Sequence, residues 1–129
     1  MKILLLAAFT SLSVFAHDLR FGSYLKMQEA LANDDMKTAL EAHGLLCEKE
    51  LLHYKDDYKD CGKKFDKIED LRTSFKKLSE VYLANGAKAE LKNLTKASCP
   101  MAKAKWVQRN GGLKNPYYGK SMLDCGEKI

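Results

Sequence analysis

The sequence predicts a mainly α-helical protein: a small antiparallel helical bundle, followed by an irregular or short-stranded C-terminal segment that a disulfide ties to it. Three observations support this prediction. Apolar residues recur at helical spacing from Phe21 to Tyr82, capping and turn residues interrupt that pattern, and the composition changes after Gly86 to short mixed stretches. We expect a single domain over residues 17–129, preceded by a signal peptide at residues 1–16.

The first sixteen residues have the pattern of a cleaved signal peptide. Lys2 gives a short positive start, an apolar run follows over residues 3–14, and the small residue Ala16 precedes His17. The run is shorter than the roughly 20 apolar residues that a bilayer span requires. We therefore expect cleavage near Ala16–His17, a periplasmic or secreted location, and a processed chain that does not span a membrane.

The helical pattern predicts four helices with recognisable ends. The run Asn33-Asp34-Asp35 suits the N-cap of the second helix, because these side chains accept hydrogen bonds from free amides of a first turn. Asn85-Gly86 is a C-cap signal for the last helix. The predicted helices cover about residues 19–32, 34–54, 57–66 and 69–84.

Cys47 and Cys61 indicate where the long helical pattern must turn. Continuous helix between them would separate their Cα atoms by about 21 Å, whereas a disulfide requires about 4.4 to 6.8 Å. A reversal near residues 55–57 would bring the two cysteines face to face across a helical hairpin. We therefore predict a Cys47–Cys61 disulfide, which would stabilise the fold by about 3 kcal/mol through loop closure.

Several classes of function find no support in the sequence. The 22 basic residues are scattered among 17 acidic ones and form no basic stripe, so we expect no nucleic-acid partner. The chain contains no Ser/His/Asp order, HExxH motif or Gly-rich phosphate loop, and no CxxC or CxxCH motif. We therefore do not expect an enzyme.

The C-terminal motif region, residues 90–129, carries the most specific pattern of the chain. It contains Cys-Pro-Met-Ala at residues 99–102, a tryptophan at position 106, and the segment NPYYGKSMLDCGE at residues 115–127. This pattern resembles the C-terminal signature of a family of bacterial exported domains of unknown function, in which Cys-Pro-Met-Ala and a tryptophan precede an NPYYG-x-x-ML-x-CGE segment. Members of that family occur as small periplasmic proteins and fused to adaptor subunits of copper and silver efflux pumps.

The resemblance extends over most of residues 17–129. The stretch YLKMQEALANDDMKTAL resembles the family's first helix, the turn and the start of the second helix, and LRTSFKKLSEVYLANGA resembles its last long helix. Cys47 and Cys61 are not part of the family pattern, so their disulfide would be a local addition. The resemblance implies a periplasmic setting and a component of a heavy-metal efflux system as partner.

The sulfur-bearing residues of the motif region suggest a metal site. Thiolate and thioether sulfurs are soft donors that favour Cu(I) or Ag(I). Trp106 could pack over such an ion or make a cation–π contact with it. In an oxidising compartment, two of the donors could instead form a Cys99–Cys125 disulfide. The sequence leaves three states open: that disulfide, a reduced metal site, and neither. The four candidate ligands are Cys99, Met101, Met122 and Cys125.

Histidines offer an alternative metal site. His43 and Cys47 are four residues apart on one helical face, a spacing at which two side chains can reach one ion. A disulfide at Cys47 would remove this pair. His17, as the N-terminus after cleavage, would offer its amine and imidazole to Cu(II).

Two functions of different classes follow from these residues. The first is a periplasmic accessory protein that binds Cu(I) or Ag(I) through the C-terminal sulfurs and assists metal efflux or homeostasis. The alternative is a metal-free, disulfide-stapled helical interaction module that docks on an envelope or efflux-pump partner. Free thiols at residues 99 and 125 would favour the first function, and two closed disulfides the second. The docking segment would comprise Asn115, Pro116, Tyr117, Tyr118 and Gly119.

Overall fold

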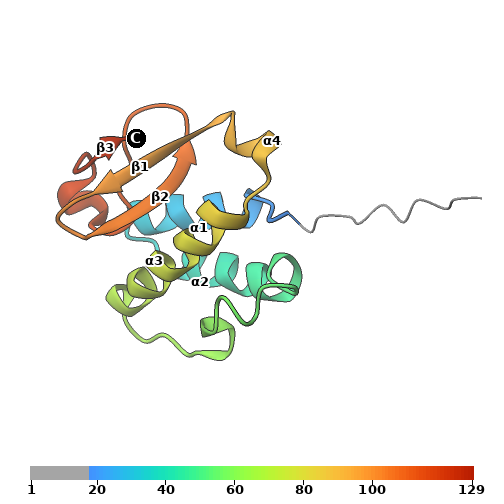
Figure 1. Ribbon diagram of the computed structural model, residues 1–129. Helices are drawn as coiled ribbons and strands as arrows, with labels where there is room; N and C mark the ends of the chain where they lie inside the picture. Colours follow the sequence, from blue (N-terminus) through green and yellow to red (C-terminus); the bar gives the residue numbers. More distant parts are fainter. Residues whose placement is uncertain (1–17) are drawn as a thin grey trace, which may run out of the picture.

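The structure, a computed structural model, describes residues 18–129 and has an α+β fold (Figure 1). The predicted signal peptide lies outside the described residues. Within residues 18–129, no helix combines the length and apolar composition that a membrane crossing needs. The elements are α1 Gly22–Ala32, α2 Met36–Leu45, a π-helical turn Leu46–Glu50, a 3-10 turn Asp60–Gly62, α3 Ile68–Asn85, α4 Lys88–Leu91, β1 Leu94–Cys99, β2 Ala104–Arg109, a 3-10 turn Gly119–Met122, and β3 Glu127–Lys128.

The prediction of a small helical bundle was wrong, because the C-terminal part forms an antiparallel sheet in the order β2-β1-β3. β1 pairs along its whole length with β2, with Leu94 opposite Arg109 and Cys99 opposite Ala104, and more briefly with β3. Extended backbone is favoured by β-branched and aromatic residues, such as Thr95 in β1 and Trp106 and Val107 in β2. β1 and β2 are only six residues long, and the lysines in them weaken the apolar alternation. The sequence pattern therefore did not predict them as a regular sheet.

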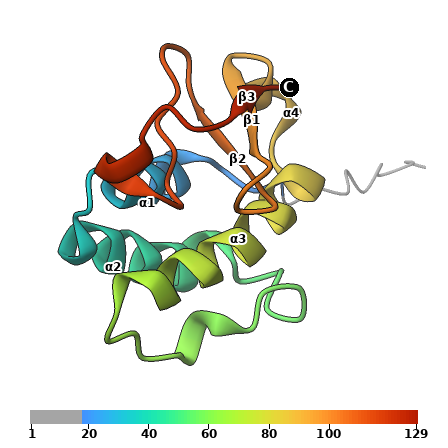
Figure 2. The same ribbon diagram turned by 90° about the vertical axis from the view of Figure 1, so that its left-hand side faces the viewer.

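The sheet and the helices form layers around one core. The sheet covers one side of α1 and α3, while α2 packs against α1 away from the sheet (Figures 1 and 2). Tyr24 of α1 joins these layers. Its hydroxyl lies 2.7 Å from Ser79 Oγ on α3 and accepts a hydrogen bond from the Val107 amide of β2 at 3.1 Å. Its ring stacks between Tyr82 and Phe75 of α3, at centroid distances of 4.5 and 4.9 Å.

The start of α2 agrees with the predicted capping signal. The Asp35 side chain accepts a hydrogen bond from the Thr38 amide at 3.1 Å, which satisfies a free donor of the first turn and lowers the pKa of the carboxyl group. The α-helix ends at Leu45 and continues as one π-helical turn to Glu50. It is therefore shorter than the predicted helix over 34–54.

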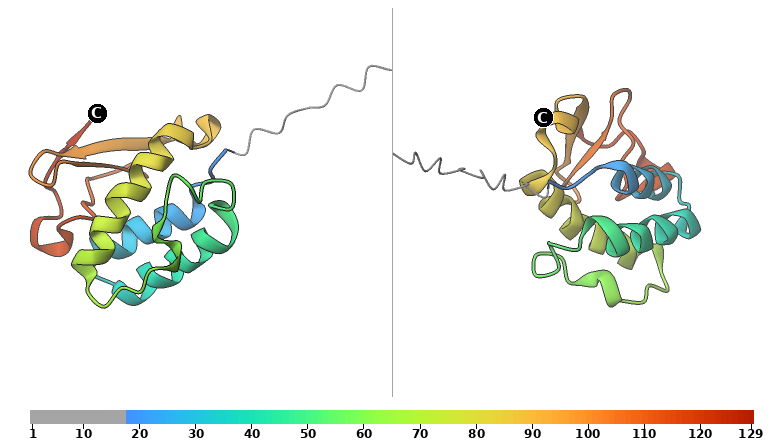
Figure 3. Two further views of the ribbon diagram at one scale, coloured as in Figure 1. Left: turned by 60° about the horizontal axis from the view of Figure 1, so that its bottom comes forward. Right: turned by 90° about the vertical axis from the view of Figure 1, so that its right-hand side faces the viewer.

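The predicted helix over 57–66 was also wrong. The chain from 51 to 67 returns along α2 to the start of α3 as an irregular connection that contains only the 3-10 turn (Figure 3). Tyr58 and Phe65, which gave this stretch its helical spacing, are both buried in the core. These two side chains anchor the connection to the core, while its backbone forms only isolated turns, such as the one closed by the Tyr58 amide and the Tyr54 carbonyl at 3.0 Å.

Cys47 and Cys61 form the disulfide that the sequence predicted, with their Cα atoms 5.5 Å apart. The bridge joins the π-helical turn after α2 to the 3-10 turn of the irregular connection. It therefore links a helix end to a loop rather than two helices of a hairpin.

The end of α3 also follows the sequence signal, although by another mechanism. The helix ends at Asn85, and Gly86 has φ −67°, which any residue can adopt. A Cβ atom at Gly86 would clash with the Phe21 ring and would lie 2.6 Å from the Tyr82 carbonyl oxygen. Leu19 pairs with Gly86 in a parallel bridge. The glycine therefore lets the segment before α1 pack against the end of α3.

Candidate metal centre

Three of the four predicted sulfur ligands lie together at one end of the sheet. Sγ of Cys99 is 3.8 Å from Sγ of Cys125, and Sγ of Cys125 is 3.9 Å from Sδ of Met101. We call Cys99, Met101 and Cys125 the sulfur cluster. Cys99 is buried, Cys125 is half-buried and Met101 is 66% exposed. The cluster therefore leads from the core to the surface.

The β1–β2 hairpin positions the first two of these side chains. Cys99 ends β1, and the loop that follows contains Met101. Pro100 suits this turn because its ring fixes φ, and its carbonyl accepts a hydrogen bond from the Lys103 amide at 3.2 Å. Lys103 has φ +50°, and this left-handed residue closes the loop. The loop thus keeps Met101 beside the end of β1.

Asn115 holds the third residue of the cluster in place. It is fully buried, and its Nδ2 donates to the Cys125 carbonyl at 2.7 Å. The backbone amide of Asn115 donates to the Leu123 carbonyl at 2.8 Å, and Asn115 Oδ1 accepts from the Tyr117 backbone amide at 2.8 Å. These bonds turn the chain so that Cys125 reaches Cys99 just before β3 pairs with β1.

The Cys99–Cys125 disulfide, one of the three states left open, is not formed in the structure. The sulfurs are 3.8 Å apart, whereas a disulfide bond is about 2.05 Å long. Pairing of β3 with β1 brings the two thiols into contact without bonding them. Desolvation, and then the neighbouring Cys99 thiol, raise the pKa of Cys125. Met122 takes part through its backbone, since its carbonyl accepts from the Cys125 amide at 3.1 Å.

Trp106 supports the backbone next to the cluster. It is fully buried, and its Nε1 donates to Gln108 Oε1 at 2.9 Å. Gly126 has φ +127°, and a Cβ atom there would lie 3.1 Å from the Trp106 ring and 2.6 Å from the Ser98 carbonyl oxygen. The residue after Cys125 is therefore pressed between the tryptophan and β1, and only glycine fits there.

The segment predicted to dock on a partner packs against the protein's own α3 and β2. The Pro116 carbonyl accepts from Arg72 Nε at 2.9 Å, and the Tyr117 hydroxyl donates to the Lys105 carbonyl at 2.6 Å. The segment thus has a structural role, and its tyrosines are its most exposed residues. Three of its residues are buried and two are half-buried: Asn115, Pro116 and Gly119, then Tyr117 and Tyr118.

His43 belongs to a buried chain of hydrogen bonds. Its Nε2 lies 2.7 Å from the Tyr58 hydroxyl, which also bonds to Ser74. The Ser74 hydroxyl in turn donates to Asp60 Oδ2 at 2.8 Å. Burial lowers the pKa of His43, and the Asp60 carboxylate opposes this shift. The chain joins α2, the irregular connection and α3.

The alternative histidine site is not assembled. Cys47 lies 3.9 Å from His43 Nε2, but its sulfur is bonded to Cys61. His17 lies outside the described residues. Within residues 18–129, no three or more histidine, cysteine, aspartate and glutamate side chains gather as a metal-binding group.

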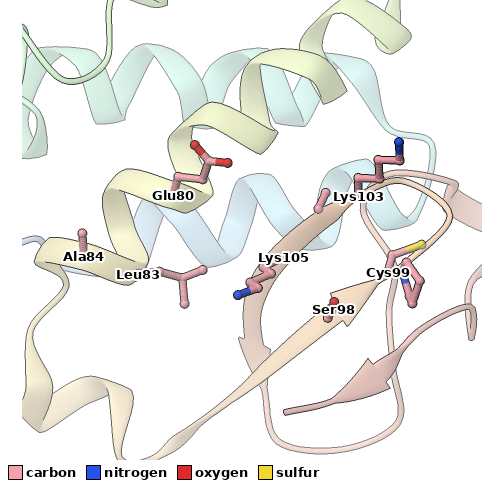
Figure 4. A pocket seen from close by; sticks show the side chains of 9 residues that line it. Glu80, Leu83, Ala84, Ser98, Cys99, Lys103 and Lys105 are labelled. Carbon is pink, nitrogen blue, oxygen red and sulfur yellow. The ribbon is translucent and has the colours of Figure 1, made fainter.

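A pocket of about 580 Å³ lies beside Cys99, between α3 and the hairpin (Figure 4). In this view Leu83 and Lys105 lie across the pocket from Cys99, and the sulfur of Cys99 is turned away from them. Cys99 lines this pocket, whereas Met101 and Cys125 are not among its lining residues. Its lining comprises Glu80, Leu83, Ala84, Ser98, Cys99, Pro100, Lys103, Ala104 and Lys105.

Comparisons of this protein with protein-family models, with curated proteins and with solved structures found no match. The resemblance of the C-terminal motif to the exported family therefore stays a prediction from the sequence.

Two residues that build the site were missed in the sequence. The sequence pattern places Asn115 only in the docking segment, although an Asn-Pro dipeptide is a turn signal and indicates a structural role. Arg72 donates to the carbonyls of Leu31 and Pro116 and to Asp34 Oδ1. No local pattern indicates this role, because the acceptors lie about forty residues away on either side in the sequence.

Proposed function

We propose that this protein is an exported accessory protein that binds Cu(I) or Ag(I) at the sulfur cluster and assists metal efflux or homeostasis. The observation that supports this proposal is the convergence of two thiols and a thioether, with successive sulfurs 3.8 and 3.9 Å apart. Such soft donors favour monovalent copper and silver over hard cations.

The spacing of the sulfurs fits a shared metal ion. A metal at the usual metal–thiolate distance of about 2.3 Å holds two ligands about 3.8 Å apart in a tetrahedral site and about 4.0 Å apart in a trigonal one. The Cys99–Cys125 and Cys125–Met101 separations both lie in this range. Because the ion binds thiolates, and the pKa of Cys125 is raised, binding should release protons and weaken as the pH falls.

The arrangement also suggests how an ion is transferred. Cys99 supplies a buried donor, whereas Met101 is 66% exposed and can meet a partner protein. The resemblance of the motif region to exported domains found with copper and silver efflux adaptors makes an efflux component our choice of partner, and the periplasm the setting.

The test is a titration of the reduced protein with Cu(I), without oxygen, in competition with a chromophoric Cu(I) chelator. Cys99→Ser and Cys125→Ser should each weaken binding by about 100-fold, and Met101→Leu by about tenfold, because each removes a donor. Met122→Leu is the matched control and should leave the affinity unchanged. Absence of stoichiometric binding in the unaltered protein, or full affinity in both serine variants, would overturn the proposal.

A further inference from the structure

The two thiols of the sulfur cluster differ in access. Cys99 is fully buried at the end of β1, whereas Cys125 is half-buried in the segment before β3. Their sulfurs are nevertheless 3.8 Å apart. A reagent from solvent can therefore reach Cys125 first, whereas Cys99 should react with such a reagent much more slowly than with its neighbour.

The backbone around Cys125 keeps this pair together. Ser98 and Trp106 lie so close to Gly126 that no side chain fits at this position. Asn115 fixes the Cys125 carbonyl through a hydrogen bond. The other two cysteines of the chain are already bonded to each other. The thiol of Cys99 thus has Cys125 as its partner for disulfide formation.

We propose that Cys125 is a modification site at which this protein undergoes thiol–disulfide exchange with an external low-molecular-weight disulfide, and that Cys99 is the resolving thiol. This inference goes beyond metal binding and does not require it. The external disulfide has the chemistry of oxidised glutathione: two small thiols joined by a bond that a protein thiolate can attack.

The exchange proceeds in two balanced steps. In the first, the Cys125 thiol loses its proton to solvent and its sulfur attacks one sulfur of the external disulfide. The external S–S bond breaks, and one small thiolate leaves with the electron pair. In the second, Cys99 loses its proton and attacks the Cys125 sulfur, and the second small thiolate leaves. The protein dithiol has then been oxidised by two electrons to a disulfide, and the external disulfide has been reduced to two thiols.

This chemistry would control the metal site. A Cys99–Cys125 disulfide removes both thiolates of the sulfur cluster, so metal binding and oxidation exclude each other. This consequence, unlike the exchange itself, rests on the proposed function.

The test uses the full chain and oxidised glutathione. Cys99→Ser should accumulate a glutathione adduct that peptide mapping places at residue 125, because the resolving thiol is absent. Cys125→Ser should form an adduct at residue 99 at least about tenfold more slowly, because that thiol is buried. The unaltered protein should form the internal disulfide without a lasting adduct. Equal adduct rates in the two variants, or a lasting adduct in the unaltered protein, would overturn the proposal.

A second measurement does not depend on the folding of the variants. The unaltered, reduced protein is exposed briefly to an alkylating agent, and the label on each cysteine is counted. Cys125 should react at least about tenfold faster than Cys99. Preferred labelling of Cys99 would contradict the assignment.

A silver arm separates this inference from the proposed function. Loading with Ag(I) should block disulfide formation in the unaltered protein, because the ion occupies the thiolates that the exchange needs. If the unaltered protein forms the disulfide equally fast with and without Ag(I), the metal proposal fails and the exchange stands. If Cys99→Ser forms no adduct at Cys125 in the absence of silver, the exchange fails whatever the metal result.

Discussion

The side-chain amide of Asn115 donates to the backbone carbonyl of Cys125 at 2.7 Å, inside the protein. This bond connects the NPYYG segment to the sulfur cluster. It explains how a segment rich in turn residues can place a cysteine accurately: one buried side chain satisfies the carbonyl that precedes Gly126. The geometry of the cluster therefore depends on a residue that contributes no sulfur.

Replacing Asn115 with alanine should lower the free energy of unfolding by about 1–3 kcal/mol, because the Cys125 carbonyl loses its buried partner. Formation of the Cys99–Cys125 disulfide under mild oxidation should also slow. Urea denaturation and the loss of free thiols measure the two effects. Asn110→Ala is the matched control, since its hydrogen bonds with Thr95 and Asn93 are exposed. Equal effects in both variants would contradict the role of Asn115.

Replacing Cys47 and Cys61 together with serine should lower the free energy of unfolding by about 3 kcal/mol, because the unfolded chain gains the freedom that the closed loop removed. Amide hydrogen exchange should rise along the connection 51–67, which the bridge holds to α2. Each single serine variant serves as a control and should lose about as much stability as the double variant. A double variant as stable as the unaltered protein would exclude a stabilising role for the bridge.

His43 should make stability depend on pH. Burial lowers its folded-state pKa, so below the unfolded value of about 6.5 the unfolded chain binds more protons than the folded one. The contribution is complete above that value and is lost as the pH falls towards the folded pKa. His43→Gln should flatten this slope in denaturation curves recorded between about pH 5 and 7. His53→Gln, at an exposed position, is the control, and a slope unchanged by His43→Gln would refute the assignment.

Gly119→Ala should destabilise the protein by more than about 1 kcal/mol. Gly119 has φ +60°, and a Cβ atom there would meet the Asp34 carboxylate and lie 2.5 Å from the Arg72 guanidinium. These two groups form an ion pair at 2.6 Å that the substitution would disturb. Thermal unfolding measures the loss. Gly112→Ala, where the space is open, should change the melting temperature much less.

Local signals in the sequence predicted local features of the fold. The helical spacing of apolar residues predicted α1 and α3. Asp35 caps the start of α2, because its side chain accepts a hydrogen bond from an amide only three residues away. The Cys47–Cys61 bridge also spans a short separation. Such features depend on neighbours in the chain, which a pattern can reveal.

The features of the fold that the sequence pattern does not reveal depend on residues far apart in the chain. Tyr58 and Phe65 have helical spacing, yet an irregular connection uses the same spacing to reach the core. β1 becomes a central strand because β3 joins it from the end of the chain. For the sulfur cluster, the residue types were predicted, but Met122 was included and the state of the two thiols was left open. Their contact depends on strand pairing and on Asn115, which spacing alone does not encode.

The position of Tyr24 has a consequence for synthesis of the protein. Its hydroxyl receives a hydrogen bond from an amide 83 residues further along the chain. While the chain grows on the ribosome, α1 can form, but the centre of the core stays incomplete until Val107 has emerged. Contacts of such long range slow folding. The nascent chain should therefore remain accessible to chaperones and proteases for as long as Val107 has not emerged.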